Sequence, residues 1–164
     1  MKIITFNAPC HIGDAGYYVW ARKKNNKYTF KMKKSVVLGF LIKKFGQYIC
    51  VKDKHGADNT IDVPMHCVST NKYIIKAAYK NLVAANKKNV SSDTQTSNVF
   101  STKIYATLSE NISVKSEYEL GEQFINRYKE QDTVTGILVT NENEIASVLG
   151  EDGGVYSFLE LKEE

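Results

Sequence analysis

The sequence predicts an α+β protein: an SH3-like small β-barrel, then a helix, then a second small subdomain made of a helix and a three-stranded meander. Three observations lead to this prediction. Residues 35–64 hold three short apolar runs joined by Gly-containing turns, the pattern of a β-meander. Residues 71–88 change to the four-residue spacing of an amphipathic helix. The charge then switches sign, because residues 1–90 carry 17 Lys/Arg against 4 Asp/Glu, whereas residues 91–164 carry 5 against 14.

Length and composition are those of a globular protein. The chain has 164 residues, of which 43% are hydrophobic, enough for one domain or two small ones. The apolar segment at the N-terminus is too short for a signal peptide, and no run approaches the ~18 apolar residues of a membrane span. The three cysteines lack the spacing of a disulfide framework. We therefore expect a cytoplasmic protein that does not contact a membrane.

The first 34 residues predict strands that lead into the meander. Residues 1–6 alternate weakly and favour an edge strand, and residues 17–20 have high β propensity. Asn25-Asn26 tolerates the positive φ of a tight turn. In residues 28–33 the apolar side chains alternate with Thr and Lys. This alternation predicts a strand with one apolar face and one basic face.

The order of these features resembles a known group of proteins. Gly-Asp precedes an aromatic strand, and K-S-V-V-x-G-F, Q-Y-I-C-V, D-V-P and V-S-T follow ahead of an Ala-containing helix. The stretch is similar to the small SH3-like β-barrel proteins of phages and mobile elements of Gram-positive bacteria. The resemblance covers residues 11–86 and implies a binding scaffold rather than an enzyme. The residues that carry it are Gly13, Asp14, Tyr17, Val36, Gly39, Tyr48, Asp62, Val63, Val68 and Thr70.

The domain boundaries follow from the composition of the middle of the chain. Residues 89–99 are polar and predict a linker between a basic barrel with its helix, at residues 1–88, and an acidic subdomain at residues 100–164. Residues 100–108 alternate and favour a strand. The tail predicts the meander, with strands at 133–140, 144–149 and 155–161.

Residues 117–130 allow two interpretations. Ser116 and Glu119 match a capping box, and apolar residues from Leu120 onward fall four apart, which favours a helix. Gly121 opposes it, because glycine costs roughly 1 kcal/mol in a helix interior. V-T-G-I-L-V near residue 135 also echoes V-L-G-F-L-I near residue 39. If this similarity reflects a degenerate duplication of the first half, residues 120–128 would form a strand. We predict the helix, because its capping signals are local and specific.

Metal binding and catalysis receive weak support. Cys10-His11 and His66-Cys67 form a mirrored pair of zinc-ligand types, and each cysteine is also a candidate thiol nucleophile. Adjacent Cys and His are not the knuckle spacing that lets two ligands wrap one ion. Asp152 with Glu160-Leu161-Lys162 loosely fits the acid and E-x-K pattern of metal-dependent nucleases, a short and common pattern. We predict no catalytic residue, no metal and no cofactor.

The basic first half carries the main functional signal. Lysines interleave with aromatic residues over residues 23–45. Lysine neutralises phosphates and exposed aromatic rings stack on bases, so this pattern points to nucleic acid or to a host nucleic-acid-handling protein. The alternative interpretation is a solvated face that protects strand edges, with Phe30, Phe40 and Phe45 in the core. The candidate residues are Lys23, Lys24, Lys27, Lys31, Lys33, Lys34, Lys43, Lys44 and Tyr28.

Two other functions stay open beside non-catalytic nucleic-acid binding. The acidic half could occupy the phosphate-binding groove of a host nuclease or CRISPR effector, as a phage anti-defence inhibitor. Its candidate surface is Glu142, Glu144, Glu151 and Asp152. A metal-dependent hydrolase is the third.

Overall fold

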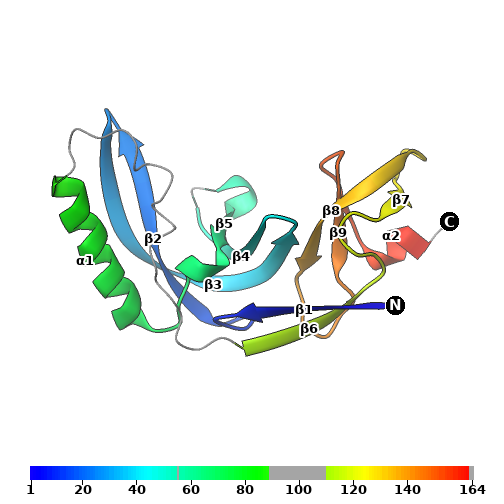
Figure 1. Cartoon of the computed structure of the whole chain (residues 1–164), viewed down its shortest axis with the longest axis horizontal. Helices are drawn as coiled ribbons and strands as arrows, with labels where there is room; N and C mark the ends of the chain where they lie inside the picture. Colours follow the sequence, from blue (N-terminus) through cyan, green and yellow to red (C-terminus); the bar gives the residue numbers. More distant parts are fainter. Residues whose placement is uncertain (55, 89–109, 163–164) are drawn as a thin grey trace.

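The computed structural model describes residues 1–54, 56–88 and 110–162 (Figure 1). Strands dominate these residues, and the strand pairs form open sheets. The predicted α+β class with a closed barrel is therefore wrong. In chain order the elements are β1 (Lys2–Ala8), β2 (Ala15–Lys24), β3 (Lys27–Lys43), β4 (Gly46–Lys52), η1 (Ala57–Asn59), β5 (Thr60–Pro64), η2 (Met65–Cys67), α1 (Lys72–Lys88), β6 (Glu110–Ser116), β7 (Gln123–Ile125), β8 (Gln131–Val139), β9 (Ser147–Gly150), β10 (Val155–Tyr156) and α2 (Phe158–Lys162).

Strand β3 is the centre of the fold. Its 17 residues pair with β2 over the first half and with β4 and β8 over the second half. The main sheet runs in the order β10-β9-β8-β3-β4-β5. The predicted meander is confirmed as the antiparallel succession β3-β4-β5. It does not close into a barrel, because β3 uses its second edge to pair with β8 instead of curling back onto its own half.

Two strand pairings join residues on either side of the predicted linker, which lies outside the described residues. β3 pairs with β8, and β1 pairs with β6 in a separate two-stranded sheet. Where β3 meets β8, Gly39 is required, since a Cβ there would lie 2.5 Å from the carbonyl oxygen of Val139. The buried core draws on both halves: Phe6 and Phe40, whose rings pack edge to face at 5.1 Å, share it with Ile112, Val134 and Ile137.

The helix predicted within residues 117–130 is wrong. Ser116 Oγ donates to the carbonyl of Tyr118, so it does not cap a helix. Gly121 has φ +85°, which ends regular structure, and its N–H donates to Val134 O. The following residues form β7 against β8. Pairing with β8 thus overrides the local helix signals, and the strand interpretation holds for residues 123–125.

Other local predictions are confirmed or corrected in detail. α1 occupies the predicted helix, and Asn25 and Asn26 take φ 52° and 60° in the β2–β3 turn. The tail contains β8, β9 and β10, but the last strand is short and residues 158–162 form α2. The strand expected at residues 100–108 lies outside the described residues.

A basic projection forms one end of the molecule, and we call it the arm: residues 15–36, which are β2 and the start of β3, together with α1. Figure 1 shows the arm rising at one end and β7, β8 and α2 at the other, with a concave side between them. α1 packs on one face of the two-stranded ribbon through a small core centred on Val19, Ile75 and Leu82. No helix of the described residues packs on the opposite face of the ribbon (Figure 1).

Candidate nucleic-acid interface

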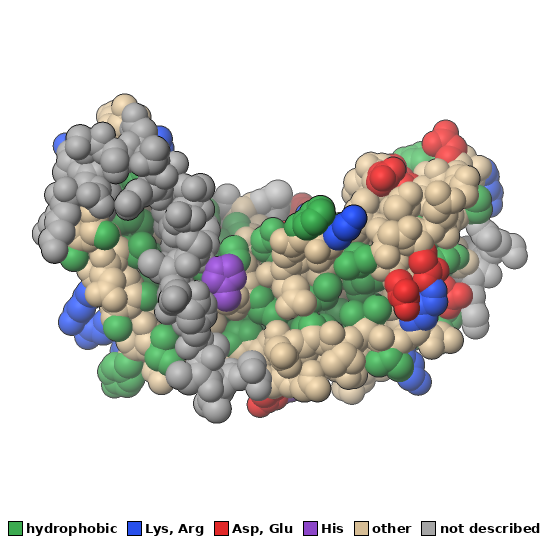
Figure 2. Space-filling view, viewed as in Figure 1, with side chains coloured by type: hydrophobic (Ala, Val, Ile, Leu, Met, Phe, Trp, Pro, Cys, Tyr) green, Lys and Arg blue, Asp and Glu red, His purple; other side chains and the backbone are tan. Residues whose placement is uncertain are grey.

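The arm concentrates the positive charge of the protein. Residues 15–36 contain seven Lys/Arg and residues 72–88 contain five, and neither segment has an Asp or Glu. The arm therefore carries +12, and the remaining residues sum to −8 in a chain of net charge +4. In Figure 2 the red side chains gather mainly at the end opposite the arm, whereas blue side chains are visible at both ends of this face.

The strand register assigns each basic side chain to a face of the ribbon. Residues directly opposite one another share a face. We define the ribbon face as the side away from α1, on which Trp20 lies opposite Lys31, Arg22 opposite Thr29 and Lys24 opposite Lys27. The predicted separation of Lys31 and Lys33 from Phe30 and Met32 is confirmed by this register.

The ribbon face is exposed and cationic. Arg22, Lys24, Lys27 and Lys31 are all exposed, and Trp20 is half-buried among them. Like charges directly opposite one another destabilise an antiparallel pair, and Lys24 and Lys27 are placed in this way. No carboxylate of the arm's own sequence relieves this repulsion. The arrangement therefore favours binding of an external anion.

Two further lysines of the ribbon, Lys23 and Lys34, lie on the side of α1. Lys23 Nζ is 5.8 Å from the Tyr28 ring centroid, and Lys34 Nζ is 5.8 Å from that of Tyr17. The candidates predicted from the sequence do not include the exposed lysines of α1, although their four-residue spacing is a signal for one helix face. They lie outside the apolar stripe that packs on the ribbon and are Lys72, Lys76 and Lys80.

Lys33 has a structural environment that the other arm lysines with described side chains lack. Its Nζ lies 2.9 Å from Oδ2 of Asp53, which is only 6% exposed, and 4.6 Å from the centroid of Trp20. The Tyr18 hydroxyl donates to the same oxygen over 2.8 Å. Burial raises the pKa of Tyr18, so the phenol keeps the proton that it donates. Lys33 thus fixes the base of the ribbon to the end of β4.

Lys43 and Lys44 lie at the other end of β3, in the tip that joins it to β4. From Lys31 to Lys43 the strand extends roughly 40 Å at ~3.3 Å per residue. Beside them Phe45 is 92% exposed, so the expectation that it belongs to the core is wrong. Phe40 is buried and Phe30 packs under α1, as expected if the basic half is a solvated face over an aromatic core.

The four acidic candidates do not form one surface. Glu142 lies in the loop before β9, where it accepts hydrogen bonds from His11 Nδ1 at 2.8 Å and from the Ile12 N–H at 3.0 Å. Asp152 follows β9 and accepts from the Tyr156 hydroxyl and the Gly154 N–H. Each shares its end of β9 with one exposed acid, which is Glu144 or Glu151 respectively.

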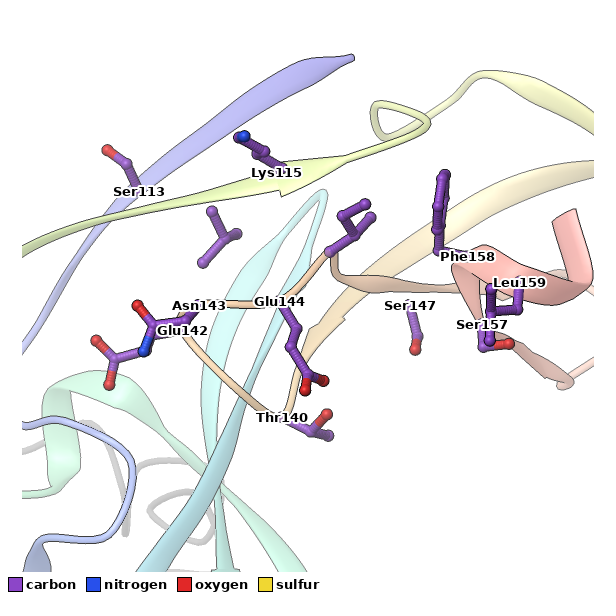
Figure 3. A pocket seen from close by; sticks show the side chains of 12 residues that line it. Ser113, Lys115, Thr140, Glu142, Asn143, Glu144, Ser147, Ser157, Phe158 and Leu159 are labelled. Carbon is purple, nitrogen blue, oxygen red and sulfur yellow. The ribbon is translucent and has the colours of Figure 1, made fainter. Parts of the chain in front are cut away.

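A cavity of about 820 Å³ lies beside the first acidic pair. Figure 3 shows Glu142 and Glu144 on the β8–β9 loop, with Phe158 and Leu159 from the start of α2 across from them. Its lining mixes acidic, hydroxyl and apolar side chains from β6, the loop and α2. This mixture does not single out a class of ligand.

The cysteine and histidine candidates are not brought together as a metal site. Cys10 and Cys67 are buried in the main core, and burial raises the pKa of each thiol to about 12, so both are protonated at neutral pH. His11 instead pairs with Glu142 and Glu110, and His66 is exposed on η2. Across residues 1–54, 56–88 and 110–162, no three His, Cys, Asp or Glu side chains are arranged to hold a metal ion.

The acid and E-x-K pattern is used for local structure. Asp152 accepts a hydrogen bond from the Tyr156 hydroxyl, as described above. Glu160 Oε2 accepts the N–H of Ser157 at 3.0 Å at the start of α2, and it lies 3.9 Å from an Arg127 nitrogen. The side chain of Lys162 lies outside the described part of the chain.

Comparisons with known proteins add no assignment. Within the described residues, no helix has both the length and the apolar character needed to span a membrane. No family model, no curated protein and no solved structure matches this chain.

Proposed function

We propose that this chain is a non-catalytic binding protein whose arm holds nucleic acid through its phosphates. The observation that carries the proposal is the arm's twelve cations without one carboxylate, in a part of the molecule that projects from the main sheet (Figure 1). Phosphate neutralisation by Lys and Arg supplies most of the affinity of sequence-independent nucleic-acid binding. Lys33 has an internal role through Asp53, whereas the ribbon-face cations Arg22, Lys24, Lys27 and Lys31 are in no ion pair with a carboxylate of the described residues.

The shape of the arm favours a duplex as the ligand. The major groove of B-DNA admits a two-stranded antiparallel ribbon. In this pose the ribbon face would enter the groove, and Arg22, Lys24, Lys27 and Lys31 would contact the phosphates that flank it. The bond from Lys33 to Asp53 and the packing of α1 would keep the ribbon rigid, which lowers the entropy lost on binding.

The alternatives have less support. An inhibitor acting through the acidic half would need a continuous acidic surface, yet Glu142 and Asp152 are engaged within the chain at opposite ends of β9. A phage or mobile-element origin and a cytoplasmic location belong to the proposal on the strength of the resemblance and composition alone. A hydrolase would need reactive groups that the buried thiols and the engaged carboxylates do not supply.

The test is the salt dependence of binding to a blunt 24-base-pair DNA duplex, measured by fluorescence anisotropy. Contacts from the four ribbon-face cations predict a slope of about −3.6 in log K against log salt, which is a loss of about 150-fold between 50 and 200 mM. The double variant Lys24→Ala/Lys27→Ala should reduce the slope by about 1.8. Lys115→Ala, an exposed lysine on β6, is the control and should leave it unchanged.

Two results would reject the proposal. One is an affinity that does not fall with salt. The other is an arm double variant that binds as the wild type does. A parallel pull-down from lysate, with and without nuclease treatment, distinguishes a nucleic-acid partner from a nucleic-acid-handling protein: capture that survives the nuclease would favour the protein.

A further inference from the structure

The tip between β3 and β4 has features that the duplex-binding arm does not use. It presents a strongly exposed phenylalanine, Phe45, beside two lysines, and it borders a second cavity. We propose that this tip is a stacking site for an unpaired nucleobase of single-stranded nucleic acid. The inference deepens the proposed function and rests on it, because it assigns the tip to the same class of ligand as the arm.

The cavity has the size and lining that such a base requires. Its volume is about 580 Å³, within the ~300–1,000 Å³ of small-molecule sites. The aromatic rings of Phe45 and Tyr48 line it from the tip, and the side chains of Leu120 and Val134 line it from the second half of the chain. An apolar, aromatic lining accepts the face of any base, since every base has a π-surface.

Turn chemistry does not explain Phe45. Two-residue hairpin turns usually need positive φ at their central residues, as Asn25 and Asn26 provide at the end of the arm. Lys44 and Phe45 occupy the corresponding positions of the β3–β4 turn, where Lys43 pairs with Gly46, and neither has positive φ. A polar residue would meet the needs of this turn equally well, so the exposed ring is left without a folding role.

The charges around the tip favour a nucleotide over a purely apolar ligand. Lys44 Nζ lies 5.3 Å from the Phe45 ring centroid, and Lys43 Nζ lies 5.9 Å from that of Tyr48. A base on the aromatic rings would therefore bring its phosphate within reach of two ammonium groups. Glu151 also lines the cavity and would repel a phosphate on its own side, so the backbone should pass along the lysines.

The experiment compares Phe45→Ala with wild type on two probes: a 12-nucleotide oligo-dT strand and the blunt duplex. Stacking on one base is worth about a 5- to 150-fold change in affinity, so the variant should lose this much for the strand and nothing for the duplex. Phe45→Trp should restore strand binding. Tyr128→Ala removes another ring, 67% exposed before β8, and is the matched control.

Three outcomes would overturn the inference: an unchanged affinity of Phe45→Ala for the strand, an equal loss on both probes, or an equal effect of Tyr128→Ala. Because Phe45 buries almost nothing, the variant should keep the melting temperature of the wild type.

A second measurement separates this inference from the proposal for the arm. In ¹H–¹⁵N spectra the dinucleotide pdTpdT should shift the amide signals of Lys44, Phe45, Gly46 and Gly121, whatever the duplex does. Shifts without duplex binding would reject the arm and keep the tip. Duplex binding without shifts would reject the tip and keep the arm.

Discussion

The bond between Lys33 and Asp53 gives the sharpest prediction about the fold. Replacing Asp53 with Ala removes the carboxylate oxygen that both the Lys33 ammonium and the Tyr18 hydroxyl contact. The Lys33 side chain is 19% exposed, and Tyr18 is fully buried. Breaking a buried pair costs about 3–5 kcal/mol, and a lost hydrogen bond to a buried group costs about 1–3 kcal/mol. Because Lys33 can turn partly toward solvent, we expect a loss of about 2–4 kcal/mol in the free energy of unfolding.

Urea denaturation of three variants measures this loss. Asp53→Asn keeps an acceptor for Tyr18 and loses the charge, so it should fall between wild type and Asp53→Ala. Lys31→Ala, on the same ribbon face but exposed, should change stability by less than about 0.5 kcal/mol. If Asp53→Ala were no less stable than Lys31→Ala, the structural role given to Lys33 would be wrong, and Lys33 would return to the candidate interface.

Three further predictions follow from other parts of the molecule. The hydrogen bond to Glu142 raises the pKa of His11 above its ordinary value. The pairing should therefore stabilise the fold below about pH 6.5, and this stabilisation should be lost as pH rises through the folded pKa. In denaturation curves, His11→Gln should remove this contribution to the difference in stability between pH 5.5 and 8.5. Gly39→Ala should cost about 1–3 kcal/mol by pushing β3 from β8, and an unchanged urea midpoint would contradict the close approach. Iodoacetamide at pH 8 should label half-buried Cys50 faster than Cys10 or Cys67 in the native protein, as read by mass spectrometry; equal rates would refute the burial of the last two.

Local signals in the sequence predicted the elements whose partners are near in the chain. The helix α1, the turn at Asn25-Asn26 and the succession β3-β4-β5 follow from periodicity and turn chemistry. The helix expected around Gly121 failed for the opposite reason. Its capping signals are local, whereas the strand that overrides them is β8, whose pairing with β7 and β3 cannot be read from a short window.

The candidate site shows the same division. Alternation in the sequence predicted that Lys31 and Lys33 share one face of the strand, because side chains alternate with a period of two. It could not separate Lys33 from Lys31, since Asp53 reaches the ribbon only through the fold. Nor could it place Phe45: a phenylalanine after an apolar run reads as core, and only its position in a two-residue turn leaves it in solvent.

The pairing of β1 with β6 has a consequence for synthesis of the protein. Lys2 meets Ser116, and Ala8 meets Glu110, so the first strand has to wait for more than a hundred further residues before its partner exists. At translation rates of about 5–20 residues per second this interval is roughly 5–20 s. The arm has no such delay, because β2 and β3 are joined by a tight turn. On the ribosome the cationic hairpin would therefore form early, while the N-terminal segment stays open to chaperones until β6 has emerged.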